Sequence, residues 1–454
     1  MSQKPSLPKG TRDFGPAQMA KRNYILNTIR SVFETYGFMP IETPAMENLS
    51  TLTGKYGDEG DQLLFKVLNS GDFLSKVDQP VTEDFKTLLP KIAEKGLKYD
   101  LTVPFARFVV MNRHELALPF KRYQIQPVWR ADRPQKGRYR EFFQCDADVI
   151  GTDSLVCEAE IIMMMNTTLA KLKIDDYTIK INNRKILTGI TEAIGAPGKE
   201  SDFCVAIDKL DKIGLDKVLE ELSERGLTQE AINKVIPILK LEGDFSTKIK
   251  TLKDTLKGSA VGIKGIEELE ETISTVEIMD GDLNKVDFDI TLARGLSYYT
   301  GAIFEIQINN VKIGSVSGGG RYDDLTGVFG MPDMSGVGFS FGVDRLYDVM
   351  EELDLFPASS LTSTHVLIIH FDEASKNYGL GVASALRKSE IKSEIYPDQA
   401  KIKKQFAYAD KKNIPYTIII GSEEMASNQL TLRNMVSGEE DKLEIDQIIK
   451  KLNN

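Results

Sequence analysis

Apolar and polar positions follow two periods along this chain, and each period predicts a different kind of element. Over 16–36 the apolar residues recur three and four positions apart, which is the spacing of one buried helix face. Pro16 suits the first position of that helix, and Gly37 suits its end. The residues of the predicted face are Ile25, Ile29, Val32 and Tyr36. Residues 37–44 then predict a turn into an extended segment, because the residue before Pro44 is disfavoured in a helix.

Two strand-like runs, 120–130 and 141–151, flank a polar stretch that contains proline and glycine, ADRPQKGRYR. This arrangement predicts a hairpin with a long basic loop, and a long loop on a rigid hairpin is more often functional than not. Between Lys121 and Arg140 the chain has seven basic residues and one acid. A segment so basic in an acidic protein indicates contact with phosphate, although charge alone fits a solvated surface loop equally well.

The middle of the chain changes to Lys, Glu, Leu and Ile at helical spacing over 185–278, which predicts a helical insertion. Strands are expected at 286–292, 302–308 and 336–341, and a helix from about 342. After a polar linker at 356–364, strands and helices alternate, which predicts a small α/β domain of βαβ units. The elements of that domain are expected at 365–370, 374–388, 393–397, 399–412 and 416–421.

Composition narrows the class of protein. The 454 residues are 41% hydrophobic and 27% charged, as in a globular chain of two or three domains. We expect no membrane partner and a cytoplasmic location, because neither a long apolar run nor a secretory signal is present. The net charge of −10 argues against nonspecific coating of nucleic acid. The three cysteines and three histidines form no CxxC or HExxH pattern, so we predict no metal-binding site built by the protein.

Arginines gather where the two strands of the predicted hairpin meet its loop. Arg130 ends the first strand, and Arg138, Arg140 and Phe142 open the second. Guanidinium groups match phosphate oxygens in a bidentate way, and an aromatic ring beside them can stack on a purine. A surface hairpin with salt bridges is the competing interpretation.

The segment LARGLSYYTGAIFE, residues 292–305, places Arg294 ahead of a predicted strand that bears Tyr298 and Tyr299. Strand alternation would put these tyrosines on opposite faces, so that only one could line a pocket. The alternative is core packing of one tyrosine and an exposed arginine.

Two glycine-bearing segments follow. In SGGGRYDDL, residues 317–325, three glycines would let the backbone approach a ligand closely, although most glycine runs are turns. In GVGFSFGVDRL, residues 336–346, a strand enters a helix whose first turn carries Arg345. The helix dipole disfavours a cation there unless the cation serves an anionic ligand, which makes Arg345 a candidate phosphate ligand. A salt bridge between Arg345 and Asp344 or a neighbour is the competing account.

Taken together, the order and the amino-acid sequences of these segments resemble those of the histidyl-tRNA synthetases, a class II family, over almost the whole chain. The matching segments are KGTRDFGP at 9–16, the helix and strand at 16–44 (motif 1), KYDLTVPFAR at 98–107, WRADRPQKGRYREFFQCDADVIG at 129–151 (motif 2), LARGLSYYTGAIFE (the histidine signature) and GVGFSFGVDRL (motif 3). The resemblance implies a ligase that activates L-histidine with ATP and Mg²⁺ and then transfers it to tRNA(His). It also implies a homodimer.

The same resemblance implies an α+β fold: a catalytic domain with an antiparallel sheet of the class II synthetase type, a helical insertion, and a C-terminal α/β anticodon-binding domain. The expected boundaries are 1–184 and 279–355 for the two parts of the catalytic domain, 185–278 for the insertion, 356–364 for the linker and 365–454 for the anticodon-binding domain.

Each matching residue acquires an implied role. Catalysis is expected of Arg130 and Arg294, both on the α-phosphate. ATP is expected to contact Arg130, Arg138, Phe142 and Arg345. Histidine is expected to contact Asp100, Thr102, Arg130, Gln144, Asp148, Arg294, Tyr299 and Tyr322. Among these, Asp100 and Thr102 would bind the amino group, Asp148 and Tyr299 the imidazole, and Tyr322 would close the pocket. The tRNA is expected to contact Arg133, Gln135, Lys403, Lys404 and Lys411.

Two details depart from the family's common pattern. Ser297 stands where many members have Asp, which puts any carboxylate-dependent orientation of Arg294 in doubt. Asp100 and Asp148 are one methylene shorter than the Glu of many bacterial members. Two other functions compete with the ligase: a paralogue that serves as a regulatory subunit of ATP phosphoribosyltransferase, and a pure RNA-binding module. The intact arginines and the 365–454 domain argue against the first, and the histidine pocket argues against the second.

Overall fold

The computed structural model of the chain describes residues 4–75, 77, 85–293, 298–357 and 364–453. The chain divides into two compact units, which are described separately below. One comprises Met1–Arg12 and Ile25–Leu355, and the other comprises Asp13–Tyr24 and Phe356–Asn454. The long helix α1 (Pro16–Thr35) contributes residues to both.

The first unit is built on an eight-stranded sheet with the order β1-β5-β6-β11-β10-β9-β7-β8. The six central strands pair antiparallel, while β1 and β8 at the two edges run parallel to their neighbours. The strands are β1 (Met39–Pro40), β5 (Phe120–Trp129), β6 (Glu141–Ile150), β7 (Tyr177–Asn183), β8 (Val286–Phe288), β9 (Ala302–Ile308), β10 (Ser317–Tyr322) and β11 (Gly336–Gly342). The predicted basic hairpin is therefore β5 and β6, with every residue of β5 paired to one of β6.

One face of this sheet is apolar because alternate residues of its strands are hydrophobic, and helices cover it. Phe33 of α1 packs its ring against Tyr123 of β5 and Phe339 of β11, with centroids 5.9 and 5.8 Å apart. Helix α6 (Val156–Lys171) contacts β11, and α13 (Ala260–Ile278) contacts β7 and β9. The predicted face of α1 is confirmed at Ile25, Ile29 and Val32, which are fully buried. The opposite face of the sheet is polar.

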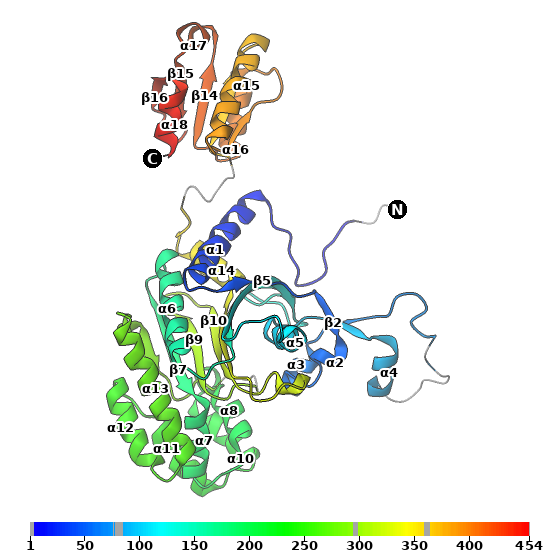
Figure 1. Cartoon of the computed structure of the whole chain (residues 1–454), viewed down its shortest axis with the longest axis vertical. Coiled ribbons are helices and arrows are strands. Elements are labelled where there is room, and N and C mark those ends of the chain that lie inside the picture. The colour runs from blue at the N-terminus through cyan, green and yellow to red at the C-terminus, as the bar shows by residue number, and fades with distance from the viewer. Residues whose placement is uncertain (1–3, 76, 78–84, 294–297, 358–363, 454) are drawn as a thin grey trace. The chain divides into compact units, whose positions relative to one another are not determined.

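The part of the chain that connects β7 to β8 in the sequence is helical, as the periodicity predicts (Figure 1). Its helices are α7 (Arg184–Ala193), α8 (Glu200–Ile207), α9 (Leu210–Ile213), α10 (Leu215–Glu224), α11 (Gln229–Leu239), α12 (Phe245–Leu256) and α13, and the 3₁₀ turn η1 (Leu283–Lys285) follows. The backbones of α7 and α13 meet at two glycines: a Cβ on Gly189 would lie 2.5 Å from the Cα of Gly262. This close approach ties the helical region to the sheet through α13.

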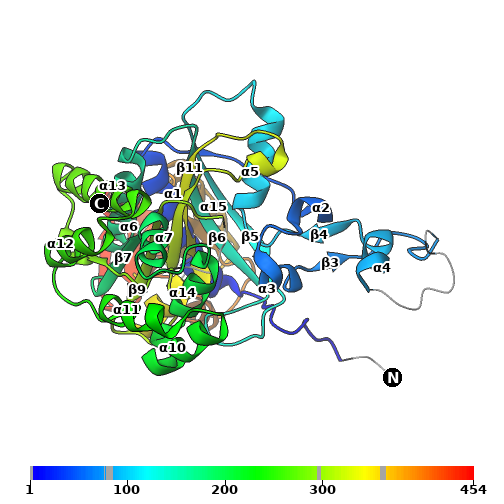
Figure 2. The same cartoon turned by 90° about the horizontal axis from the view of Figure 1, so that it is seen from below.

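A small three-stranded sheet, β2-β4-β3, extends away from the large one, as both views show (Figures 1 and 2). Its elements and neighbours are β2 (Met46–Asn48), α2 (Leu49–Leu52), α3 (Gly57–Gln62), β3 (Lys66–Val67), α4 (Phe85–Ile92), β4 (Lys95–Leu97) and α5 (Thr102–Asn112). The first unit is completed by the 3₁₀ turn η2 (Gly327–Phe329) and the helix α14 (Val343–Glu352).

The second unit contains a five-stranded sheet with the order β13-β12-β14-β15-β16. Its first three strands are parallel, as the βαβ pattern predicts, but β15 and β16 are antiparallel and were not predicted. The elements are β12 (Val366–His370), α15 (Glu373–Lys388), β13 (Ser393–Ile395), α16 (Ile402–Lys411), β14 (Tyr416–Ile420), α17 (Ser422–Ser427), β15 (Leu430–Asn434), β16 (Glu440–Leu443) and α18 (Ile445–Asn453).

Two expectations about the first unit are wrong. The strand expected at 286–292 ends at Phe288, because Asp289 turns the chain by accepting hydrogen bonds from the backbone and hydroxyl of Thr291. Tyr298 and Tyr299 lie before a strand and not within one, since β9 begins at Ala302. Among the described residues, no helix is long and apolar enough to cross a membrane.

Candidate active site

The polar face of the eight-stranded sheet brings together residues that are far apart in the sequence. Directly paired residues of an antiparallel sheet point to the same face, so the register shows which residues form each row across that face. One row runs Gln124, Asp146, Ser340, Gly318 and Glu305. The next runs Arg122, Asp148, Gly338, Gly320 and Ile303. Figure 2 shows β5, β6 and β11 side by side. We call this surface the polar face; Tyr322, one row further along β10, also belongs to it.

Asp148 lies at the centre of the polar face and is held from two sides. Its Oδ2 forms an ion pair with Nη2 of Arg122 at 2.7 Å, and its Oδ1 accepts a hydrogen bond from the Tyr322 hydroxyl at 2.7 Å. All three side chains are buried, and Arg122 is completely so. The structure thus brings the predicted histidine ligands Asp148 and Tyr322 together, and adds an arginine that the sequence had not singled out.

Glycines make this cluster possible, because a side chain at either of two positions would occupy its space. A Cβ on Gly338 would lie 2.0 Å from Oδ1 of Asp148, and a Cβ on Gly336 would lie 2.5 Å from the ring of Tyr322. The glycines of GVGFSFG therefore serve close approach of side chains across β11.

The carboxyl groups of this face have unusual acidities. Burial raises the pKa of Asp148, while Arg122 and the Tyr322 hydroxyl act in the opposite direction. Burial raises the pKa of Asp146 to about 7; Arg122, whose Nη2 lies 4.0 Å from Oδ2 of Asp146, lowers it, and the neighbouring Asp148 raises it further. Burial, with Asp148 beside it, also raises the pKa of Tyr322, so that its hydroxyl stays protonated and donates to Asp148. Two acids and one guanidinium thus share a buried site.

Asp100 and Arg130 form a second cluster near the polar face. Oδ1 of Asp100 accepts from the Tyr56 hydroxyl at 3.0 Å and from the Val103 backbone at 3.2 Å. Burial raises the pKa of Asp100, and Arg130 counteracts it. Thr102, predicted beside Asp100, is the first residue of α5.

The guanidinium of Arg130 is stacked and anchored, which fixes its position. Its carbon lies 4.2 Å from the ring centroid of Tyr99 and 5.2 Å from that of Phe142, and its Nε donates to the Tyr99 carbonyl at 3.1 Å. An aromatic contact of this kind favours a cation that is partly removed from water. Arg130 and Phe142, both predicted to contact ATP, therefore lie side by side.

Five buried polar atoms around these clusters have no hydrogen-bond partner within the described part of the chain. They are Oδ2 of Asp100, Nε of Arg122, Oε1 of Gln144, Oδ1 of Asp146 and Oδ2 of Asp148, the last of which contacts Arg122 as an ion pair. Native proteins leave few such atoms, since each costs roughly 1–3 kcal/mol. Gln144 is otherwise fixed, because its amide donates to the Ser340 hydroxyl at 2.9 Å. Atoms of this kind on and beside the polar face are available to a ligand or to water.

The predicted phosphate ligands lie at the loop between β5 and β6. Arg138 and Gln135 close a tight turn through two backbone hydrogen bonds of 2.9 and 3.0 Å, and Arg133 and Gln135 are exposed. Nε of Arg345 donates to the Gly137 carbonyl at 2.9 Å, and its Nη1 donates to the Ser315 carbonyl. Arg345 thus joins the start of α14 to the loop.

Asp344, which the sequence offered as a salt-bridge partner of Arg345, contacts other groups. Its Oδ1 pairs with Arg12, and its Oδ2 accepts from the Phe143 backbone at 3.1 Å. Arg12 also lies over the Tyr139 ring, 3.2 Å from its centroid. Arg12 therefore reaches the loop of the hairpin, and it is a residue that sequence reasoning did not assign.

Tyr298 and Tyr299 lie beside each other rather than on opposite faces. Their ring centroids are 4.8 Å apart, and Tyr298 meets the Tyr322 ring edge-on at 6.3 Å. The expectation that they lie on opposite faces of a strand is wrong, because strand alternation does not apply before Ala302. Gly320 leaves room here too: a Cβ on it would lie 2.7 Å from the Tyr299 ring. Arg294 and Ser297 fall outside the described residues.

In the second unit, the predicted tRNA contacts lie on one helix. Lys403, Lys404 and Lys411 are exposed on α16, while Gln405 and Ala409 are buried beneath them. Gln405 fastens the helix to β12, accepting from the His370 backbone at 3.2 Å and donating to its carbonyl at 2.7 Å. The three lysines therefore lie on the exposed side of α16.

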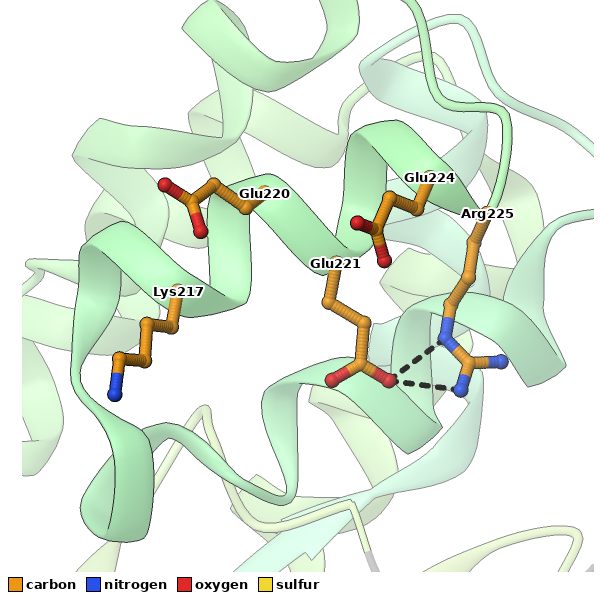
Figure 3. A pocket seen from close by; sticks show the side chains of 5 residues that line it. All are labelled: Lys217, Glu220, Glu221, Glu224 and Arg225. Carbon is orange, nitrogen blue, oxygen red and sulfur yellow. Dashed lines mark hydrogen bonds and ion pairs between the residues drawn. The ribbon is translucent and has the colours of Figure 1, made fainter.

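A hollow on α10 belongs to a different surface. It is lined by Lys217, Glu220, Glu221, Glu224 and Arg225 (Figure 3). Glu221 accepts from Nε and Nη2 of Arg225 at 2.9 and 2.7 Å. Pairs of this kind, four residues apart on a helix, contribute about 0.3–0.5 kcal/mol. The hollow is a solvated helix face held by ion pairs, and it carries no strained or orphaned group.

Sequence reasoning missed Arg122, Asp146 and Tyr56. A signal was present for the first: Arg122, Gln124 and Gln126 alternate with Tyr123 and Ile125 in a strand that is otherwise apolar. Polar residues at alternate positions of a central strand predict a second, functional face. Because Arg122 also falls within the basic stretch from Lys121 to Arg140, its charge is easily attributed to the loop. Tyr56 has no such signal, because only the fold places it against Asp100.

Comparison with known proteins gives consistent matches. A family model described as histidyl-tRNA synthetase matches residues 89–346, and one described as an anticodon binding domain matches 365–454. The histidine–tRNA ligase of Cytophaga hutchinsonii is 59% identical, covering 99% of this chain and 100% of that protein. That of Christiangramia forsetii is 56% identical, covering 98% of both. The crystal structure of histidyl-tRNA synthetase from a Nostoc species is similar with a TM-score of 0.85 at 31% identity, covering 99% of this chain and 100% of that one.

Proposed function

The chain belongs to the histidyl-tRNA synthetase family, and on that premise we propose how the residues of its polar face carry out the reaction. The enzyme activates L-histidine with ATP, which gives histidyl-adenylate and pyrophosphate, and transfers histidine to the 3′ end of tRNA(His). The observation that carries the assignment of residues is the set of orphaned polar atoms on and beside the polar face.

Histidine, in this proposal, completes that network. The side chain of Asp148, which accepts from the Tyr322 hydroxyl, also accepts from the imidazole N–H, and the Tyr299 hydroxyl serves the other ring nitrogen. Asp100 accepts from the amino group through Oδ2, the oxygen that has no hydrogen-bond partner among the described residues. Thr102 is proposed to bind the amino group as well, and Gln144 is a further histidine contact. A site with such buried polar groups rejects isosteres that cannot pair with them, by roughly 10⁴-fold or more.

ATP lies, in this proposal, at the junction of the hairpin loop and α14. Phe142 stacks on adenine, Arg130 and Arg294 hold the α-phosphate, and Arg138 and Arg345 hold the outer phosphates. Arg130 also holds the histidine carboxylate. The rigid stacking of Arg130 between Tyr99 and Phe142 supports this role, because a preorganised cation costs no reorganisation during reaction.

The chemistry requires those cations. The histidine carboxylate attacks the α-phosphorus in line and pyrophosphate leaves, so two anions must approach each other. Fixed guanidinium groups offset their repulsion and stabilise the charge that develops in the transition state. No covalent enzyme nucleophile is needed.

Mg²⁺ is proposed to come with ATP. The described residues hold no group of three or more potential metal ligands, and Mg²⁺ usually binds through one or two carboxylates together with substrate phosphates. Glu305, in the same row as Ser340 and Gly318, is the candidate carboxylate. Bound there, the ion would neutralise phosphate charge.

We further propose that the enzyme is a cytoplasmic homodimer whose second unit reads the tRNA. Arg133 and Gln135 on the hairpin loop and Lys403, Lys404 and Lys411 on α16 are the proposed tRNA contacts; all five are exposed. Motif 1, with α1 and β1, is the proposed dimer element. A monomer in sedimentation at micromolar concentration would refute the dimer.

The test of the proposed function is ATP–pyrophosphate exchange with each of several amino acids. Exchange that depends on histidine alone, followed by charging of tRNA(His), is the expected result. The regulatory-subunit alternative predicts neither reaction, and an RNA-binding module predicts tRNA binding without exchange. Relatives of 50–59% identity over nearly the whole chain bear the ligase name, which favours the ligase over the regulatory subunit.

A further inference from the structure

Arg122 is a buried cation that no step of the proposed reaction uses. It lies on β5 with its side chain completely buried, and its guanidinium carbon sits 4.2 Å from the ring centroid of Phe105. Its Nη2 lies 2.7 Å from Oδ2 of Asp148 and 4.0 Å from Oδ2 of Asp146. Even a paired guanidinium can cost more in desolvation than its ion pair returns, so the buried position of Arg122 favours a role beyond packing.

The two oxygens of Asp148 are engaged by different groups, and this fixes the plane of the carboxylate. Arg122 holds Oδ2 from β5, and the Tyr322 hydroxyl holds Oδ1 from β10. The backbone contributes as well, since Gly338 leaves the space that Oδ1 occupies. Each oxygen keeps a further lone pair, so a substrate N–H can still bind.

We propose that Arg122 is the positioning residue for histidine recognition: its guanidinium keeps the Asp148 carboxylate ionised and in one orientation, so that Asp148 can accept from the imidazole N–H. This inference rests on the proposed function and adds a specificity determinant that does not itself touch the substrate.

Charge balance on the polar face supports the assignment. The titratable and charged groups that face the Asp146–Asp148 pair are Arg122 from β5, Tyr322 from β10, and Asp100 and Lys98 from the segment between β4 and α5. Burial lowers the pKa of Lys98 to about 8, so Arg122 is the cation of this set that stays charged at every working pH. Without Arg122, two buried acids would face each other, and the pKa of both would rise.

The test compares Arg122→Gln and Arg122→Lys with the unaltered enzyme in histidine-dependent pyrophosphate exchange. Loss of a charge-assisted contact corresponds to a rise in KM for histidine of about 10- to 100-fold for Arg122→Gln at pH 7, with KM for ATP changed less than about 3-fold. Arg122→Lys keeps the charge but loses the planar fork. Its KM for histidine should therefore lie between that of the unaltered enzyme and that of Arg122→Gln.

The dependence on pH separates this role from a structural one. The ratio of histidine KM values, variant over unaltered enzyme, should fall as the pH rises, because Asp148 regains its charge. Titration of the substrate imidazole cancels in that ratio. A ratio below about 2-fold, or one that does not change with pH, overturns the proposal.

Arg321→Gln is the matched control. Arg321 is also a buried arginine of the same sheet, but it lies on the helix-covered face and pairs with Glu158 of α6, with Nη2 and Oε2 2.7 Å apart. Its replacement should lower the melting temperature and leave the ratio of histidine KM values flat across pH.

A second variant keeps the proposal testable if Arg122→Gln does not fold. Arg122→Gln combined with Asp146→Asn removes one buried cation and one buried acid together, so the net buried charge is unchanged. This double variant should fold and still show a raised KM for histidine; an unaltered KM refutes the role of Arg122. If the unaltered enzyme itself shows no histidine-dependent exchange, the proposed function fails instead, and the two outcomes are distinct.

Discussion

Replacing Gly338 by alanine should impair histidine recognition while leaving ATP binding nearly intact. The new Cβ would lie 2.0 Å from Oδ1 of Asp148 and 2.3 Å from its Cγ, whereas real Cβ contacts stay beyond 3.0 Å. Asp148 must therefore shift, yet Arg122 and Tyr322 hold it at 2.7 Å on both sides. Breaking one charge-assisted hydrogen bond costs about 1.5–3 kcal/mol, which corresponds to roughly 10- to 100-fold in kcat/KM for histidine.

The assay is pyrophosphate exchange at varied histidine, together with a fluorescence titration with ATP. The chain has one tryptophan, Trp129, and it adjoins Arg130, with its Nε1 donating to Glu141 at 2.7 Å. Its fluorescence should therefore report ATP binding separately from histidine binding. The matched control is Gly342→Ala on the same strand and the same face, where the nearest atom to a new Cβ is the Val316 carbonyl oxygen at 3.7 Å. Unchanged kcat/KM for histidine in Gly338→Ala would refute the packing argument.

The remaining predictions address other parts of the mechanism. Asp148→Asn should raise KM for histidine in pyrophosphate exchange by about 10-fold or more, because an amide lacks the charge of the acceptor; an unchanged KM would mean that another acid binds imidazole. Arg294→Lys should lower kcat more than either KM, since the bidentate fork serves the transition state; a raised KM for ATP at constant kcat would make Arg294 a binding residue only. Replacing Lys403, Lys404 and Lys411 with Ala should weaken tRNA binding and flatten its dependence on salt, whereas replacing the exposed Lys388 and Lys450 should do neither; filter binding at several salt concentrations decides this.

Local patterns were sufficient to predict much of the fold. The hairpin of β5 and β6, the helical region between β7 and β8, and α15 and α16 each follow from a periodicity within about twenty residues. The strands β15 and β16 escaped prediction because they are short and carry polar residues, in LTLRN and EDKL, where alternation is weak. The extent of β8 was overestimated, since VDFDITL reads as one run and only the side chain of Asp289 ends it.

The candidate site was harder to predict, because its residues meet through register and not through spacing. Asp148 and Tyr322 are 174 positions apart, and no local pattern pairs them. The resemblance to a family identified both residues as histidine ligands, but it carried no geometry. It therefore indicated neither the contact of Arg122 with Asp148 nor the close approach that requires glycine at position 338. The roles assigned to Arg130, Arg138 and Arg345 remain predictions, although each guanidinium lies at the hairpin or its loop.

Two buried arginines on opposite faces of one sheet show how to tell a structural charge from a functional one. Arg321 is fully satisfied: its guanidinium donates to Glu158, to the Ser335 hydroxyl and to the backbone carbonyls of Thr152 and Ser154. Arg122 has two acids nearby, yet its Nε and Oδ1 of Asp146 lack hydrogen-bond partners within the described part of the chain. Both arginines cost desolvation energy, but only the second leaves its network open. An open network is unstable by itself and becomes favourable when a ligand with matching donors and acceptors enters, so selection for binding, rather than for folding, explains why the polar face retains it.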